Sequence, residues 1–161
     1  MGSKKCAGVR DLIEQTRGGV LALVALFLPI AVLCVGMVVD LGTVFFVRKA
    51  VQAACDLGAL AAVQELDWDL LALGTVSLRV GEAEAVAEEI TGDNLEGIEA
   101  LVRDVQVSAT ALNPPAEGEP TVAVTVTYSV RTPFLRTLPG LGEGFHDRRV
   151  SEASVVKRTE W

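Results

Sequence analysis

The chain has 161 residues, enough for one domain, and a net charge of −7 from 14 Lys and Arg against 21 Asp and Glu. Half of the residues are apolar, which excludes an intrinsically disordered chain. The acidic balance argues against a nucleic-acid binder, because phosphate backbones require a basic face. With one His and three separated Cys, no metal site and no cofactor are expected.

Residues 18–39 form a run of 22 uncharged residues. As a helix this run is about 33 Å long, enough to cross a hydrocarbon core of roughly 30 Å. A cleaved signal peptide would have an apolar region of about 7–15 residues followed by a small-residue cleavage site, and the run is longer than that. The pattern therefore predicts a transmembrane helix. Pro29 lies in mid-span, either as a tolerated proline or as a functional kink.

Charge on the two sides of this run predicts its orientation. Residues 1–17 carry a net charge of +2 and residues 40–161 a net charge of −9. The positive-inside rule then places a basic cytoplasmic segment at the N-terminus and the rest of the chain outside, in a single-pass protein of the cytoplasmic (inner) membrane. Asp40, at the outer edge of the span, is interpreted as an interfacial residue, with pairing to a partner as the alternative.

The helix is expected to continue beyond the membrane as a stalk over residues 40–66, because this stretch lacks Pro and is rich in Ala and Leu. A stripe of small residues recurs every fourth position along it, at Ala50, Ala54, Gly58 and Ala62. Small residues in such a stripe allow another backbone to approach closely. The stripe packs either on the protein's own sheet or on a helix of another subunit.

Residues 67–161 are predicted to form an extracytoplasmic α+β head. Residues 82–90 have helical periodicity, with Ala83, Val86, Ala87 and Ile90 on one buried face, and residues 94–102 extend this helix after a break. Alternating patterns predict strands over 102–112 and 121–130, joined by a turn-rich loop, and a third strand over 150–158. The expected fold is α+β, with a long N-terminal helix packed on a small antiparallel sheet.

Two further segments carry predictions about the surface and the core of the head. Residues 132–149 hold too many Gly and Pro for regular structure, and their Phe and Leu residues predict a loop folded onto the core. The alternation over residues 102–112 places four side chains on one face of that strand, those of Val105, Val107, Ala109 and Ala111.

Residues able to carry chemistry are scarce and scattered. His146 has no Cys partner nearby and is interpreted as a surface residue. Asp67 and Asp69 lack the spacing of a calcium loop and are expected in a solvated bend. Cys55 is expected to be a buried free thiol, with an intersubunit disulfide as the alternative. No nucleophile elbow, phosphate loop or zinc spacing occurs, so an enzyme is not expected.

The N-terminal third resembles the TadE/TadG-like proteins of tight-adherence (Flp) pilus systems. The resemblance covers residues 17–65 and rests on motifs in a fixed order: Arg17-Gly18, Leu28-Pro29, Val39-Asp40-Leu41-Gly42, Phe45-Phe46, Arg48-Lys49 and an Ala-rich helix. The glutamate of prepilins has no counterpart, because Leu23 or Val24 stands at its place.

This resemblance implies a short minor pilin or pseudopilin-like structural subunit. Its partners would be other pilus-assembly subunits, membrane helices and the bilayer, in a homo- or hetero-oligomer and without nucleic acid. The alternative is a signal-anchored extracytoplasmic sensor or adaptor domain that is not part of a filament.

Overall fold

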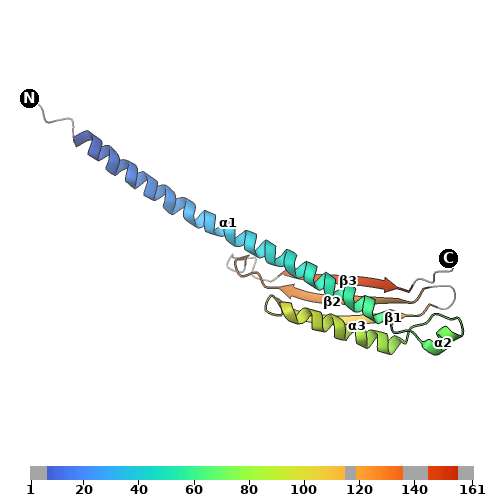
Figure 1. The fold of residues 1–161 in the computed structure, drawn as a ribbon. Coiled ribbons are helices and arrows are strands. Elements are labelled where there is room, and N and C mark those ends of the chain that lie inside the picture. Colours follow the sequence, from blue (N-terminus) through green and yellow to red (C-terminus); the bar gives the residue numbers. More distant parts are fainter. Residues whose placement is uncertain (1–6, 115–118, 136–144, 156–161) are drawn as a thin grey trace, which may run out of the picture.

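The computed structural model describes residues 7–114, 119–135 and 145–155, with side chains from Gly19 onward. Its elements are α1 (Ala7–Ala62), α2 (Trp68–Ala72), α3 (Val80–Leu95), the 3-10 turn η1 (Glu96–Ile98), β1 (Val102–Leu112), β2 (Thr121–Val130) and β3 (Phe145–Ser154). The first half of α1 projects away from the head, and its second half lies along the sheet (Figure 1). The predicted α+β fold, with a long N-terminal helix on a small antiparallel sheet, is confirmed.

The sheet has three antiparallel strands in the order β1-β2-β3. One face is covered by two helices, because α1 packs on β2 and β3 while α3 packs mainly on β1. The central strand β2 confirms the predicted alternation, and its buried apolar and aromatic residues are Val122, Val124, Val126, Tyr128 and Val130. The strand is sandwiched between two others and under both helices, which is why its inward positions are all apolar or aromatic.

The second half of α1 is a core element of the head. Its residues Val47, Val51, Cys55 and Ala59 are each at most 1% exposed and belong to the same apolar cluster as the β2 residues. These positions follow helical spacing and form one buried stripe. The helix ends at Ala62 rather than at about Leu66, and an isolated bridge then pairs Leu66 with Leu78.

The linker between α1 and α3 corrects one interpretation. Asp67 is the N-cap of α2, because its Oδ1 accepts the backbone N–H groups of Asp69 at 3.1 Å and Leu70 at 3.2 Å. These bonds satisfy donors that a helix start leaves unpaired. The expected solvated bend is therefore a capped helical turn.

The helix α3 is longer than expected, because it continues without a break through the predicted interruption at residues 91–94. Its buried side chains recur every fourth residue, at Ala83, Ala87, Thr91 and Leu95, while Val86 and Ile90 are only half-buried. The polar Asp93 and Asn94 face solvent, where they cost the helix little. The α-helix ends at Leu95, residues 96–98 form the 3-10 turn η1, and β1 begins at Val102, so the predicted extension over 94–102 is not α-helical beyond Leu95.

The strand β1 has the predicted bounds, but one of its side chains is oriented differently from the prediction. A bulge between Arg103 and Gln106 shifts the register by one residue, and Asp104 adopts a positive φ of 52° there. Val105 is consequently 40% exposed and does not share the face of Val107, Ala109 and Ala111, on which the alternation placed it. Val107, Ala109 and Ala111 do pack on the core.

The free edge of β1 is covered by acidic side chains of α3. Glu84 accepts the backbone N–H of Ala111 at 3.0 Å, and Glu88 accepts that of Ala109 at 3.2 Å. Unpaired edge donors are a template for unwanted strand pairing, and these carboxylates remove two of them.

The strand β3 begins at Phe145 rather than at residue 150, so residues 145–149 of the predicted irregular loop are regular strand. They pair with residues 126–130 of β2. Within this strand His146 is exposed, as expected. Residues 136–144 of that loop and 156–158 of the predicted third strand lie outside the described residues.

Candidate functional site

The first functional feature is a long apolar helix surface that the head does not cover. Every described residue from Gly19 to Val35 is exposed. The segment is long and apolar enough to cross a membrane, and α1 runs through Pro29 without interruption. Pro29 is therefore accommodated inside a continuous helix. The surroundings of Arg17 and Gly18 lie outside what the structure describes.

The head first meets this helix at Gly36. A Cβ added at Gly36 would lie 2.6 Å from Cδ1 of Phe134, a separation that real Cβ atoms do not show. The missing side chain therefore lets the Phe134 ring lie directly on the helix backbone. Sequence reasoning did not single out Gly36, because its contact lies almost a hundred residues away.

Asp40, one turn further, ties the same segment to the helix. Its side chain is fully buried, and its carboxylate accepts the backbone N–H of Leu135 at 2.5 Å and that of Phe134 at 3.4 Å. Charge-assisted bonds of this kind offset part of the cost of burying a carboxylate. The interpretation of Asp40 as an interfacial residue is wrong, because the chain's own loop covers it.

The small-residue stripe packs within the chain on α3. Ala54, Gly58 and Ala62 are buried, and Ala50 is half-buried. A Cβ at Gly58 would lie 2.8 Å from the carbonyl oxygen of Ala87 and would also clash with the Thr91 hydroxyl. Close helix contact is thus the role of this glycine, and the contacted surface is a helix of the same chain rather than the sheet.

The remaining predicted packing residue, Gly42, has open space around it. Nothing lies within 4 Å of a Cβ added there. The chain itself therefore imposes no need for a glycine at this position. Taken together, the predicted residues are distributed along α1 at successive levels and do not converge on one cavity.

A polar seam joins α1 to the edge strand β3, and no sequence signal pointed to it. Asp147 accepts an ion-paired hydrogen bond from Arg48 at 2.9 Å, another from Arg149 at 3.1 Å, and the Tyr128 hydroxyl at 3.2 Å. The Arg48 guanidinium also lies 4.7 Å from the centre of the Phe145 ring. The alternation of Asp147 and Arg149 could have indicated a strand, but their partner Arg48 is far away in the sequence.

The seam changes the titration of Asp147. Burial alone would raise the pKa of Asp147, but the backbone N–H of Arg148 and the charges of Arg149 and Arg48 outweigh it and lower the pKa below its ordinary value. The carboxylate is therefore held in its charged form.

The only cysteine thiol in the described core is that of Cys55, which is free and fully buried. Burial raises its pKa from 9.0 to about 11, and the neighbouring Asp56 adds to the shift. The expectation of a buried free thiol is confirmed. No cluster of three or more His, Cys, Asp or Glu side chains able to hold a metal occurs within the described part of the chain.

Comparison with known proteins adds one match. Residues 18–65 match the model of the family Tad, described as Flp pilus-assembly TadE/G-like. Neither the curated proteins nor the solved structures give a match to this chain. The matched range begins in the exposed apolar helix, includes Gly36 and Asp40, and ends just beyond α1. The resemblance to the TadE/G-like Flp pilus-assembly family is thereby confirmed over residues 18–65.

Proposed function

We propose that this protein is a minor pilin or pseudopilin-like structural subunit in the assembly of an Flp-type pilus, and not an enzyme. Residues 18–39 hold it in the cytoplasmic membrane, with the N-terminus inside and the head outside. The observation that carries the proposal is the continuity of α1, which runs from an exposed apolar segment directly into the core of the head. The family match over residues 18–65 supports the pilus system.

The proposed mechanism is packing of apolar helices. The segment from Gly19 to Val35 is about 25 Å long, and exposed apolar side chains continue on one face through Leu41, Phe45 and Phe46. In a bilayer or in a filament core, such helices associate through van der Waals contacts. The head, held rigidly at Gly36 and Asp40, then faces outward and presents its surface to other subunits.

Site-specific photocrosslinking in the native host tests the assembly. A photoreactive residue replaces Leu26, which is 66% exposed on the apolar helix, and in a matched chain it replaces Val150, which is 51% exposed on the far side of the sheet. We expect the helix position to form adducts with other subunits of the pilus machinery, and a deletion strain to lose pili. Normal piliation of the deletion strain would contradict the proposal and favour the anchored sensor or adaptor.

A reporter fusion tests the orientation separately. Alkaline phosphatase, which becomes active only outside the cytoplasm, is fused after Trp161, and we expect activity because the basic residues lie before the span. A matched fusion of a fluorescent protein that matures only in the cytoplasm should stay dark. The reverse pattern would refute the orientation while leaving membrane insertion intact.

A further inference from the structure

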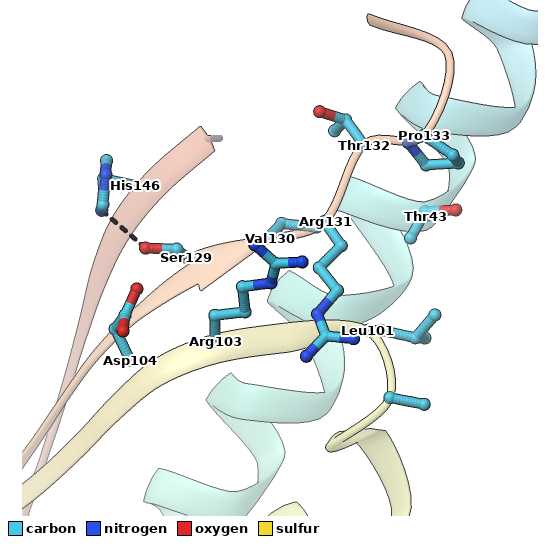
Figure 2. Close-up of a pocket in the computed structure, with 11 residues that line it drawn as sticks. Thr43, Leu101, Arg103, Asp104, Ser129, Val130, Arg131, Thr132, Pro133 and His146 are labelled. Carbon is cyan, nitrogen blue, oxygen red and sulfur yellow. Dashed lines mark hydrogen bonds between the residues drawn. The ribbon is translucent and has the colours of Figure 1, made fainter. Parts of the chain in front are cut away.

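A pocket of about 510 Å³ opens at the end of the sheet nearest the exposed part of α1 (Figure 2). Its walls come from the first residues of β1 and β3, the end of β2, and α1. The polar residues that line it are Thr43, Arg103, Asp104, Ser129, Arg131, Thr132 and His146. None of the contacts described for the packing of α1 uses this pocket.

The strand register sets three of these side chains in one row across the sheet, and a fourth lies beside it. Arg103 of β1 is opposite Ser129 of β2, and Ser129 is opposite His146 of β3. Arg131 follows Ser129 by two residues and so lies on the same side of the chain. Ser129 Oγ and His146 Nδ1 are 2.6 Å apart, and the two arginine side chains extend beside each other (Figure 2).

The residues that line this pocket carry more positive than negative charge. Among the described residues, neither the Arg103 nor the Arg131 guanidinium forms an ion pair, although the chain as a whole is acidic. Asp104, which lies in the bulge, is the one carboxylate in the lining, whereas two guanidinium groups line it. Two guanidinium forks beside a hydroxyl suit the oxygens of a phosphate group.

The depth of the pocket along α1 indicates where such a phosphate would come from. Thr43 lies four residues after the end of the predicted span at Val39, which is about 6 Å along the helix axis. The headgroup layer of a bilayer extends roughly 5–7 Å beyond the hydrocarbon core on each side. The pocket thus lies at the level of lipid headgroups, if the span is placed as proposed above.

We propose that this pocket binds the phosphate group of an anionic phospholipid in the leaflet facing the head. Arg103 and Arg131 contact the phosphate oxygens. With His146 Nδ1–H donating to Ser129 Oγ, the Ser129 hydroxyl proton is left to donate to the headgroup. The inference rests on the proposed membrane anchor but not on the pilus role. The bound lipid would fix the tilt of the head against the membrane surface, because the pocket adjoins the loop that Gly36 and Asp40 hold.

Native mass spectrometry of the full chain released from nanodiscs tests this proposal. The nanodiscs contain equal amounts of phosphatidylglycerol and phosphatidylcholine, which differ in net charge. We expect wild-type protein to retain one phosphatidylglycerol in preference to phosphatidylcholine. The double variant Arg103→Gln/Arg131→Gln should lose this preference by about tenfold or more, because it removes two charge-assisted contacts.

The matched control is Arg148→Gln, which removes an exposed arginine of β3 that does not line the pocket. It should retain the lipid as wild type does. Equal lipid retention by wild type and double variant, with both inserted in the bilayer, would overturn this inference and leave the anchor standing. Failure of wild type to insert into neutral liposomes would refute the anchor itself. Displacement of the lipid by an equal concentration of inorganic phosphate would overturn the assignment to a lipid.

Discussion

Replacement of Gly58 by alanine probes the contact between α1 and α3 with one added carbon. The new Cβ would lie 2.8 Å from the Ala87 carbonyl oxygen, whereas ordinary contacts begin at 3.4 Å, so the helices must separate by about 0.6 Å at this point. The Thr91 hydroxyl is closer still and must rotate away, which disrupts its bond to the carbonyl of Ala54. Overpacking of this kind costs about 1–3 kcal/mol.

The opposing term is helix propensity. Alanine is favoured over glycine in a helix interior by about 0.5–1 kcal/mol. Gly92→Ala provides the matched control, since Gly92 lies in α3 next to Thr91 and a Cβ there would meet nothing within 4 Å. Gly92→Ala should therefore stabilise the head, and the difference between the two variants, about 1–3 kcal/mol, isolates the steric cost.

The assay is hydrogen exchange of the buried β2 amides in the full chain, held in detergent micelles. Exchange of these amides through global opening of the head reports the free energy of unfolding even when the membrane segment stays helical. In the double variant Gly58→Ala/Thr91→Ala the loss should be partly recovered, because one of the two clashing groups is gone. Equal stabilisation by Gly58→Ala and Gly92→Ala would refute the close contact.

Three further predictions concern buried polar groups. Asp40→Asn should raise the rate of hydrogen exchange at the Leu135 amide by about tenfold or more, because a charged acceptor is replaced by a neutral one, while the exchange rates of the β2 amides stay unchanged. An unaltered exchange rate at Leu135 would contradict its hydrogen bond to Asp40. Cys55, with a pKa of about 11 against 9.0, should be alkylated at pH 8 about 100-fold more slowly in the folded chain than in urea, when the other cysteines are replaced by Ser; equal rates would contradict its burial. The pKa of Asp147 is lowered in the folded chain, so its stabilisation is present above its unfolded pKa of about 3.9 and is lost as the pH falls through the folded value. The difference in unfolding free energy between wild type and Asp147→Asn should therefore shrink below about pH 4, and a difference independent of pH would refute the ion pair with Arg48.

The apolar periodicity of the sequence correctly predicted those elements that pack against apolar side chains. The strand β2 alternates strictly because both helices press on one of its faces, and its bounds were predicted correctly. The first half of β3 was missed because its inward positions, Asp147 and Arg149, are polar. Asp147 pairs with Arg149 and with Arg48, which lies almost a hundred residues earlier. A period-2 apolar pattern cannot reveal such a pairing.

The candidate packing residues show the same limit. The spacing of Ala54, Gly58 and Ala62 correctly indicated close approach of a backbone, because small side chains have no other packing advantage. Which backbone approaches is a tertiary fact, and here it is that of α3. Asp40 was misread because a carboxylate at a membrane edge looks interfacial until its partners are known, and those partners lie 94 and 95 residues later.

The boundary between anchor and head therefore differs according to the property considered. By charge, the boundary lies at Asp40, where the uncharged run ends. By packing, the boundary lies at Gly36, where Phe134 contacts the helix backbone. Because the segment between these two residues belongs to both parts, no flexible linker separates the apolar helix from the folded core. A helix that bundles with others in a membrane or filament would then set the direction of its head directly, and any rotation of α1 would turn the Gly36 and Asp40 contacts with it.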